Sequence, residues 1–495
     1  MLLKHFFIEK IAHSSYLLGG AKSCAIIDPQ RDISIYIDTA RDLDLDISYI
    51  LETHLHADFV SGHLDLADRT GATVYAPKKG NCSFNHKALS EGDIIQLEKM
   101  QINIIETPGH TPEHISYIII DTTRGKDPIG VFVGDTLFVG DVGRPDLFPG
   151  KAEELAKKLY HSLHTKLMKL PDFTEVYPAH GAGSLCGKAI GAKYQTTIGY
   201  ERKYNPILQI ENEEEFIQRL TTNMPPAPDH FSRCSEINRT GPRLIRNLPH
   251  LKEISPEAFN KIIEDENIVI VDCRSYDAFG GQHIPGSYNI DLGGNFATFA
   301  GWTIPPEEKI ILVTTTYEQA LEAKIRLHRV GLDNIIGYLD GGMAGWVTSG
   351  FKTNRVDQLS SEDFHEMSKL DQKFILVDVR SPNEYNDSHI QGSINIPAPS
   401  LRTRYKELNQ DATIVLQCST GNRSSLAASI LKKHGFHKLF NLAGGMKGYN
   451  AAGYGPVCKA CYGYHGPRID EDIRWYTSPR HFTIHNKSDM DHIED

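Results

Sequence analysis

Three features are scarce in this sequence: long apolar runs, cysteines and an excess of positive charge. No run approaches ~18 consecutive apolar residues, about the length that a membrane span needs. Eight cysteines are spread over 495 residues, so they do not form the dense disulfide framework of a small secreted domain. The net charge of −11 argues against nucleic-acid binding and against attraction to an anionic membrane surface. We therefore expect a protein that binds neither nucleic acid nor membranes.

The N-terminus also lacks the continuous apolar stretch of a signal peptide. Its apolar patch at residues 6–8 is interrupted by Glu9, Lys10 and His13. We expect this patch to be the first strand of a cytoplasmic protein. The remaining composition is ordinary for a globular protein, with 40% hydrophobic and 23% charged residues. The length accommodates roughly three domains of ~150 residues each.

The stretch Glu-Thr-His-Leu-His-Ala-Asp-Phe at residues 52–59 carries the strongest signal for chemistry. It follows a run typical of a buried strand, and His54, His56 and Asp58 are spaced two residues apart. Along an extended chain such residues point to one side, so they can converge on one spot. Imidazole nitrogens and carboxylate oxygens are ligands of transition metals such as zinc or iron.

Three later segments strengthen this interpretation. His110 lies in TPGHTPEH, Asp135 in FVGDTLF and His180 in YPAHG. Each segment follows a strand-like run and is rich in Gly or Pro, as expected of active-site loops on a rigid scaffold. The order and number of these residues make a chance arrangement improbable, and the sequence therefore predicts a metal site.

The first 230 residues alternate short β-rich runs with turn signals and helices. The clearest helix covers residues 151–170, where leucines recur every four residues from Leu155 to Leu167. The expected strands are residues 24–27, 48–52, 73–75, 102–106, 114–120, 131–134 and 175–177. This mixture predicts two sheets flanked by helices. The stretch at 225–228, Pro-Pro-Ala-Pro, is typical of a stiff spacer before the next domain.

The rest of the chain contains an internal duplication. Three pairs of matching segments define it: 268–274 with 374–380, 283–287 with 389–393, and 341–343 with 444–446. Each copy is about 100 residues of alternating strands and helices, so we expect two small α/β domains on parallel sheets. Residues 456–495 are polar and patternless, and we expect an extension with little core of its own.

The second copy contains a candidate nucleophile. An apolar strand at 414–417 runs into Cys418-Ser-Thr-Gly-Asn-Arg423, and a helix follows. Such a loop aims backbone N–H groups at its centre, and the helix dipole adds positive potential. A thiol there should act as a thiolate, with Arg423 as a fixed cation beside it. In the first copy Thr314 and Gln319 occupy the equivalent positions, so that domain should be inactive, a spacer or a docking module.

Two other cysteine features leave alternatives open. Cys186 lies among glycines just after His180, which favours a mobile, exposed segment. It could relay sulfur or be a passive loop cysteine. Cys458 and Cys461 form a single C-x-x-C pair, which could bind a metal or form a disulfide.

The motifs of the first 230 residues resemble the metallo-β-lactamase fold, an αββα sandwich. Hydrolases of that fold, such as glyoxalase II, carry H-x-H-x-D-H, but here Phe59 replaces the last histidine. Because that histidine binds the second metal, a one-metal site is the better expectation.

The site more closely resembles that of persulfide dioxygenases. The resemblance implies one Fe(II) per chain, with zinc as the alternative, held by His54, His110 and Asp135. It places three further side chains around these ligands: His56, Asp58 and His180. Arg144, in VGDVGRPDLFPG, becomes a candidate anchor for the carboxylates of the substrate.

The duplicated segments resemble rhodanese, a sulfurtransferase family. The shared motifs are DVR, the HI-x-GS turn, CSTGNRS and GGM. Related phosphatases use a loop one residue longer, so the shorter loop favours sulfur over phosphate. Cys418 and Arg423 would be catalytic, and the residues between them would bind substrate: Ser419, Thr420, Gly421 and Asn422.

The whole chain resembles a bacterial fusion of a persulfide dioxygenase with two rhodanese domains. The expected boundaries are 1–235, 250–352, 356–455 and 456–495. The resemblance implies oxidation of small thiol persulfides by O₂ to sulfite, then sulfur transfer through Cys418 to give thiosulfate; we also expect a homo-oligomer. Two alternatives remain: a zinc thioester hydrolase fused to a sulfurtransferase, and a persulfide carrier or sensor with a structural metal.

Overall fold

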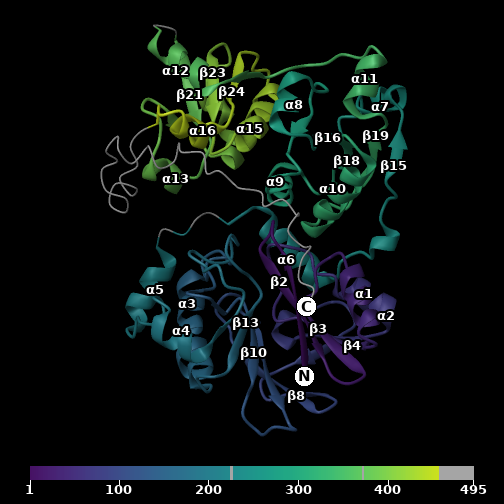
Figure 1. The fold of residues 1–495 in the computed structure, drawn as a ribbon, viewed down its shortest axis with the longest axis vertical. Helices are drawn as coiled ribbons and strands as arrows, with labels where there is room; N and C mark the ends of the chain where they lie inside the picture. Colours follow the sequence, from purple (N-terminus) through teal and green to yellow (C-terminus); the bar gives the residue numbers. More distant parts are fainter. Residues whose placement is uncertain (223, 225–226, 371–372, 456–495) are drawn as a thin grey trace, which may run out of the picture.

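The computed structural model describes residues 1–222, 224, 227–370 and 373–455. The proposed extension at 456–495, with Cys458 and Cys461, and part of the proline spacer lie outside the described residues. Figure 1 shows a first domain below and two smaller domains above it. Within the described ranges, no helix combines the length and the apolar character that a membrane crossing requires.

The first domain contains two mixed sheets packed face to face. In spatial order the first sheet consists of β1 (Leu2–Ile8), β2 (His13–Gly19), β3 (Ser23–Ile27), β4 (Asp46–Leu51), β5 (Thr73–Pro77) and β6 (Lys87–Leu89). The second consists of β14 (Thr196–Thr197), β13 (Glu175–Pro178), β10 (Gly130–Gly134), β9 (Ile115–Asp121), β8 (Met100–Glu106) and β7 (Ile94–Leu97). A small hairpin pairs β11 (Leu137–Phe138) with β12 (Asp141–Val142). One apolar cluster, including Leu18, Ile102 and Phe132, fills the space between the two sheets.

Helices cover both outer faces of this pair of sheets. They are α1 (Ser34–Asp42) and α2 (His63–Thr70) on the first sheet, and α3 (Ala152–His161), α4 (Ile198–Tyr204) and α5 (Glu213–Thr221) on the second. The αββα sandwich and the β1 strand are confirmed. The expected helix at 151–170 is continuous, because α3 runs into a π turn (Ser162–Lys166) and a 3₁₀ turn (Leu167–Lys169). All four leucines of its stripe are fully buried.

The middle and last domains share one strand order, which confirms the duplication. The middle sheet has the order β15 (Lys252–Ile254), β19 (Ile335–Leu339), β18 (Lys309–Val313), β16 (Ile268–Asp272) and β17 (Tyr288–Asn289). The last has β20 (Asp357–Leu359), β24 (Leu439–Leu442), β23 (Thr413–Gln417), β21 (Phe374–Asp378) and β22 (Ile394–Asn395). All strand pairs in both sheets are parallel.

Helices surround both parallel sheets. The middle domain has α7 (Pro256–Ile262), α8 (Tyr276–Gly281), α9 (Phe296–Thr303), α10 (Tyr317–Arg329) and α11 (Gly342–Thr348). The last has α12 (Ser361–Lys369), α13 (Pro382–Asp387), α14 (Leu401–Arg404), α15 (Asn422–Lys433) and α16 (Gly445–Ala451).

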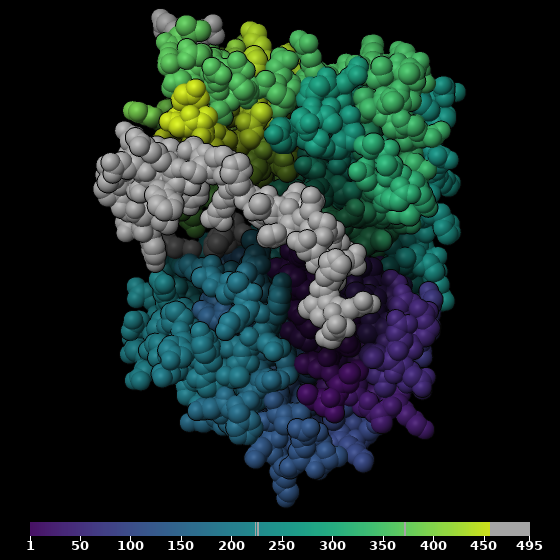
Figure 2. All heavy atoms as spheres, viewed as in Figure 1, coloured from purple at the N-terminus to yellow at the C-terminus, as the bar shows by residue number. Residues whose placement is uncertain are grey.

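Apolar packing joins the domains to one another. A single cluster of buried side chains runs through the middle and last domains and also includes Ile11 and Phe59 of the first. In the space-filling view the two smaller domains lie next to each other above the first domain (Figure 2). Helix α6 (His230–Thr240) lies where the first and middle domains meet (Figure 1). The expected boundary at residue 235 falls inside this helix.

Candidate metal centre and sulfur-transfer loop

Three side chains from separate loops of the first domain converge on one buried point. His54 follows β4, His110 follows β8 and Asp135 follows β10. Asp135 Oδ2 lies 3.3 Å from His110 Nε2 and 3.8 Å from His54 Nε2. All three side chains are at most 1% exposed, and none of these three atoms has a hydrogen-bond partner among the described residues. Buried polar atoms are rarely left unpaired, so their convergence requires an explanation.

Hydrogen bonds at the other nitrogens fix the two imidazole rings. His110 Nδ1 lies 2.9 Å from the backbone carbonyl of Arg144, which can only accept, so Nδ1 carries the proton. His54 Nδ1 lies 2.9 Å from Thr53 Oγ1, whose own proton is donated to Asp28 Oδ2 at 2.9 Å. Thr53 therefore accepts from His54. In both rings Nε2 is left as a lone pair that faces Asp135.

Burial keeps these two histidines neutral, since it lowers the pKa of His110 and lowers that of His54 well below its ordinary value. Burial opposes ionisation of Asp135, but the charged His180, which is hydrogen-bonded to it, holds its pKa well below the usual range. The point of convergence is thus formed by two imidazole lone pairs and a carboxylate oxygen. Such a donor set repels itself unless a cation lies between the atoms, and it fits a divalent transition metal.

The other residues of the 52–59 stretch do not join this trio. The chain bends after β4 instead of staying extended, so the expectation that His54, His56 and Asp58 converge on one spot is wrong. His56 Nε2 lies 3.2 Å from Asp28 Oδ1 and 3.6 Å from Glu52 Oε2. Although burial opposes it, the charges of Asp28 and Glu52 raise the pKa of His56.

His180 bridges two carboxylates. Its Nδ1 lies 2.7 Å from Asp135 Oδ1 and its Nε2 lies 2.8 Å from Asp58 Oδ2. Although burial opposes it, the charges of Asp135 and Asp58 raise the pKa of His180 well above its ordinary value. His180 therefore contacts the trio at Asp135, and Asp58 contacts His180; their role around a bound metal stays a prediction.

Cys186 is buried, not exposed as its glycine-rich surroundings suggest. Its residue is 1% exposed and it packs with Ala57, Phe138 and Phe231. Its loop is held because the backbone N–H of Arg144 donates to the Cys186 carbonyl at 2.9 Å and Asp141 accepts from the N–H groups of Lys188 and Ala189. Burial raises the pKa of the Cys186 thiol well above its usual value. Its sulfur lies near Asp58 and His180, so the three could form a second metal-ligand group.

Arg144 is also an internal residue. Its guanidinium makes two hydrogen bonds to Asp146, at 2.7 and 2.8 Å, and one to the Leu185 carbonyl at 3.1 Å. Its side chain is 1% exposed. Its role as an anchor for substrate carboxylates stays a prediction, whereas its backbone carbonyl contributes directly by orienting His110.

Two buried residues near the metal centre are missing from the sequence prediction. His114 Nε2 accepts the backbone N–H of Asp135 at 3.0 Å, and its Nδ1 faces Thr107 Oγ1 and Thr136 Oγ1 at 3.0 and 3.1 Å. Burial lowers the pKa of His114 to about 3, so this ring is neutral and fixes the Asp135 backbone. The second residue is Asn238 of α6, whose amide bonds to the backbone of residues 56, 59 and 61. His114 could have been noticed from its place four residues after His110, but nothing marks Asn238.

The thiol loop of the last domain lies between β23 and α15, as expected. Cys418 is fully buried, and its Sγ accepts the backbone N–H of Gly421 at 3.1 Å. The Ser424 hydroxyl lies 3.3 Å from the same sulfur. Gly421 has a φ of +105°, which lets the loop turn so that its N–H points inward.

Arg423 is held by a partner that sequence reasoning missed. Its guanidinium pairs through two nitrogens with Glu384 of α13, at 2.6 and 2.7 Å. Although burial opposes it, the hydrogen-bonded guanidinium lowers the pKa of Glu384 to about 2. The sequence did contain a signal that fixes Glu384 in place. Ser381 and Glu384 have the spacing of a capping box at the start of α13, and each side chain bonds to the other residue's backbone N–H.

The equivalent loop of the middle domain is closed by its own side chains. Thr314 occupies the position of Cys418 and donates to the Thr316 carbonyl at 2.9 Å. Gln319 occupies the position of Arg423 and accepts the Thr315 N–H at 2.9 Å. This loop has neither a nucleophile nor a cation.

Comparison with known families and proteins supports this division of the chain. Residues 9–180 match the metallo-beta-lactamase superfamily, and residues 255–349 and 360–452 each match the rhodanese-like domain. The mitochondrial persulfide dioxygenase ETHE1 of Bos taurus is 31% identical over 240 residues, covering 47% of this chain and 85% of that protein. The hydroxyacylglutathione hydrolase GloC of Haemophilus influenzae is 29% identical over 216 residues, covering 39% and 91%.

One solved structure resembles most of the described chain. The metallo-beta-lactamase from Staphylococcus aureus subsp. aureus COL is 35% identical, with a TM-score of 0.62, and the match covers 68% of this chain and 98% of that one. The likeness therefore extends beyond the first domain.

Proposed function

Because the chain belongs to the metallo-beta-lactamase superfamily, with persulfide dioxygenase homologues, and carries two rhodanese-like domains behind that domain, we propose that it oxidises small thiol persulfides and transfers sulfur. In the proposed first reaction, one persulfide R–S–SH, one O₂ and one water give the thiol R–SH and sulfite with two protons. In the second, a sulfane sulfur passes through Cys418 to sulfite and forms thiosulfate.

The observation that carries the first reaction is the trio of unpartnered acceptors on His54, His110 and Asp135. A Fe(II) ion held there would supply an open coordination face at which sulfur and dioxygen can meet. The protein residues would set the geometry. Thr53 and the Arg144 carbonyl orient the two rings, and His114 holds the Asp135 backbone. His180 keeps protons on both nitrogens and directs Asp135 Oδ2 into the site.

The thiol loop supports the second reaction. The Cys418 thiolate would attack the outer sulfur of R–S–SH, forming Cys418–S–SH and releasing R–S⁻. Sulfite would then attack the outer sulfur of that cysteine persulfide, forming thiosulfate and returning the thiolate, with the proton passing to solvent. The Gly421 N–H and the Ser424 hydroxyl stabilise negative charge on the sulfur. A shared chain raises the local concentration of sulfite near Cys418.

A Cys418→Ser variant tests the coupling. We expect sulfite to accumulate at the unmutated rate while thiosulfate falls to the uncatalysed level. Thiosulfate formed at the wild-type rate would refute the relay. Measurement of iron and zinc per chain, with O₂ consumption, tests the first reaction. The carrier or sensor alternative would be favoured if protein loaded with iron consumed no O₂ in the presence of persulfide.

Two observations favour a second candidate, a zinc thioester hydrolase. Asp58, His180 and Cys186 form a group that could hold a second ion, and a hydroxyacylglutathione hydrolase is among the relatives. Hydrolases of this type hold hydroxide between two metals. Against it stand Phe59, in place of a ligand, and the two hydrogen bonds that already occupy His180. Two metals per chain with thioester cleavage in the absence of O₂ would establish it. A cytoplasmic location and a homo-oligomer stay predictions.

A further inference from the structure

The loop at residues 56–61, which contains His56 and Asp58, is held by a residue that lies outside the sheets of the first domain. Asn238 of α6 is 2% exposed, and its Nδ2 donates to the carbonyls of His56 and Phe59, both at 2.8 Å. Its Oδ1 accepts the N–H of Ser61 at 2.8 Å. One amide side chain thus fixes the turn from residue 56 to residue 61.

The middle domain holds the same loop at its next residue. The N–H of Val60 donates to the backbone carbonyl of Arg329 at 2.7 Å, at the end of α10. Phe59, beside it, belongs to the apolar cluster that fills the middle domain. The ring of Phe59 also lies 4.5 Å from that of His56, so packing against the middle domain reaches a histidine of the motif.

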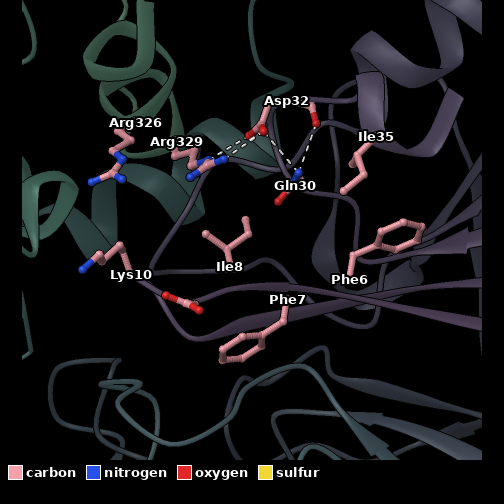
Figure 3. Close-up of a pocket in the computed structure, with 10 residues that line it drawn as sticks. Phe6, Phe7, Ile8, Lys10, Gln30, Asp32, Ile35, Arg326 and Arg329 are labelled. Atoms are coloured by element: carbon pink, nitrogen blue, oxygen red, sulfur yellow. Dashed lines mark hydrogen bonds and ion pairs between the residues drawn. The ribbon is translucent and has the colours of Figure 1, made fainter. Parts of the chain in front are cut away.

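The guanidinium of Arg329 holds a second loop of the first domain. It pairs through two nitrogens with Asp32, at 2.7 and 2.8 Å. Figure 3 shows this pair at the edge of a hollow of about 340 Å³ between β1 and α10. Asp32 lies in the segment after β3, and the Gln30 amide supports it with a bond to its carboxylate at 3.2 Å.

The two loops that Arg329 holds are joined to each other and to a proposed ligand. The Gly62 N–H and the Ser61 hydroxyl donate to the Pro29 carbonyl at 2.9 and 3.0 Å. Asp28, in the same segment, accepts from Thr53, which accepts from His54. A short series of contacts therefore runs from Arg329 through the 28–32 segment to the ring of His54.

We propose that the middle domain, whose own loop has neither thiol nor cation, serves as a clamp for the metal centre, with Arg329 as its positioning residue. The clamp consists of the Arg329 carbonyl on Val60 and the Arg329 guanidinium on Asp32. It holds the 28–32 and 56–62 segments in the geometry that presents His54 to the metal. This inference rests on the proposed function only in that a metal occupies the site.

The test compares Arg329→Gln with a matched control, Arg326→Gln. Arg326 lies one turn earlier on α10 and lines the same hollow (Figure 3), but it bonds to Glu322 and the Leu292 carbonyl within the middle domain. We expect Arg329→Gln to weaken metal binding about tenfold or more, the usual effect of losing a group that orients ligands. Arg326→Gln should bind metal as the wild type does.

Two readouts without persulfide decide the outcome. The first is Zn(II) and Fe(II) affinity from competition with a chelator. The second is hydrogen exchange at the Val60 amide. Arg329→Gln keeps the backbone carbonyl that accepts from Val60, so we expect faster exchange there because the end of α10 is no longer held by the pair with Asp32. Amides of β23 in the last domain should stay unchanged. The double variant Arg329→Asp with Asp32→Arg, which swaps the two charges, should restore part of the metal affinity and part of the slow exchange at Val60. A merely structural effect at either position would not produce this recovery.

Unchanged affinity and unchanged Val60 exchange in Arg329→Gln would overturn the proposal, as would equal losses in Arg326→Gln. If Arg329→Gln does not fold, Arg329→Lys is measured by the same criteria, because it keeps the charge but loses the two-nitrogen pairing. A wild-type protein that binds metal but does not oxidise persulfide would refute the proposed function and leave the clamp to be judged by these measurements.

Discussion

Replacing Thr53 with valine removes one hydroxyl from the metal centre while keeping the shape of the side chain. Thr53 is fully buried, and its Oγ1 both accepts from His54 Nδ1 and donates to Asp28 Oδ2, each at 2.9 Å. Valine leaves His54 Nδ1 without an acceptor. A buried donor left unpaired costs about 1–3 kcal/mol. Asp28 keeps the Thr53 N–H at 2.7 Å, so the larger loss falls on His54.

The cost should appear mainly in metal binding. Without an acceptor at Nδ1, the neutral His54 ring gains by moving its proton to Nε2, which lies 3.8 Å from Asp135 Oδ2. That proton must leave again before a metal can bind. We therefore expect a loss of about 10–100-fold in metal affinity, which corresponds to about 1.4–2.8 kcal/mol. The metal-free protein should lose less stability, because the proton that has moved to Nε2 of His54 can interact with Asp135 in place of Thr53.

Chelator competition measures the affinity, and thermal unfolding with and without metal measures the two stabilities. Thr53→Ser is the matched control, since it keeps the hydroxyl and should retain most of the affinity. The reasoning is refuted if Thr53→Val binds metal within about twofold of the wild type, or if Thr53→Ser loses as much as Thr53→Val.

Three further predictions concern the thiol loop. Glu384→Gln should slow thiosulfate formation, because Arg423 loses its charged partner, while sulfite formation is unchanged; equal thiosulfate rates would contradict this role. Because the pKa of Glu384 is lowered to about 2 in the folded protein from 4.5, the stability it contributes is complete above about pH 4.5 and is lost as the pH falls toward 2. Acid unfolding curves of wild type and Glu384→Gln should therefore converge over that range. Gly421→Ala should destabilise the last domain by about 1–3 kcal/mol, since its φ is +105° and an added Cβ would lie 3.0 Å from the Tyr276 ring. Denaturant unfolding measures this loss of stability. Adding Tyr276→Ala to Gly421→Ala should recover only the part of the loss that comes from the contact between the new Cβ and the Tyr276 ring.

Motifs with fixed spacing and strong residue types could be predicted from the sequence. The histidines and Asp135 lie where buried strands end, and Cys418 lies between an apolar strand and a helix, so local pattern was enough to find them. The leucine stripe of α3 was predictable for the same reason, because the leucines recur every four residues over consecutive helical turns.

Features that depend on distant contacts could not be predicted in this way. Alternation along the chain suggested that His54, His56 and Asp58 converge, but the segment bends because Asn238, 177 residues after Ser61, fixes its backbone. Glycines around Cys186 suggested exposure, yet Asp141 and Arg144 fold that loop inward. The burial and hydrogen-bond partners of such residues depend on contacts between segments that are far apart in the sequence. Residue type and local spacing do not indicate those contacts.

Phe59 has a consequence for how this chain can change over generations. The ring of Phe59, at the position where the resemblance to hydrolases of this fold implies a histidine, is also part of the apolar cluster shared with the middle domain. Substituting histidine would place a polar ring in that junction and weaken the contact beside Val60. Packing between the domains therefore opposes a histidine at position 59, so a change of the metal site at this position also requires a change of the junction.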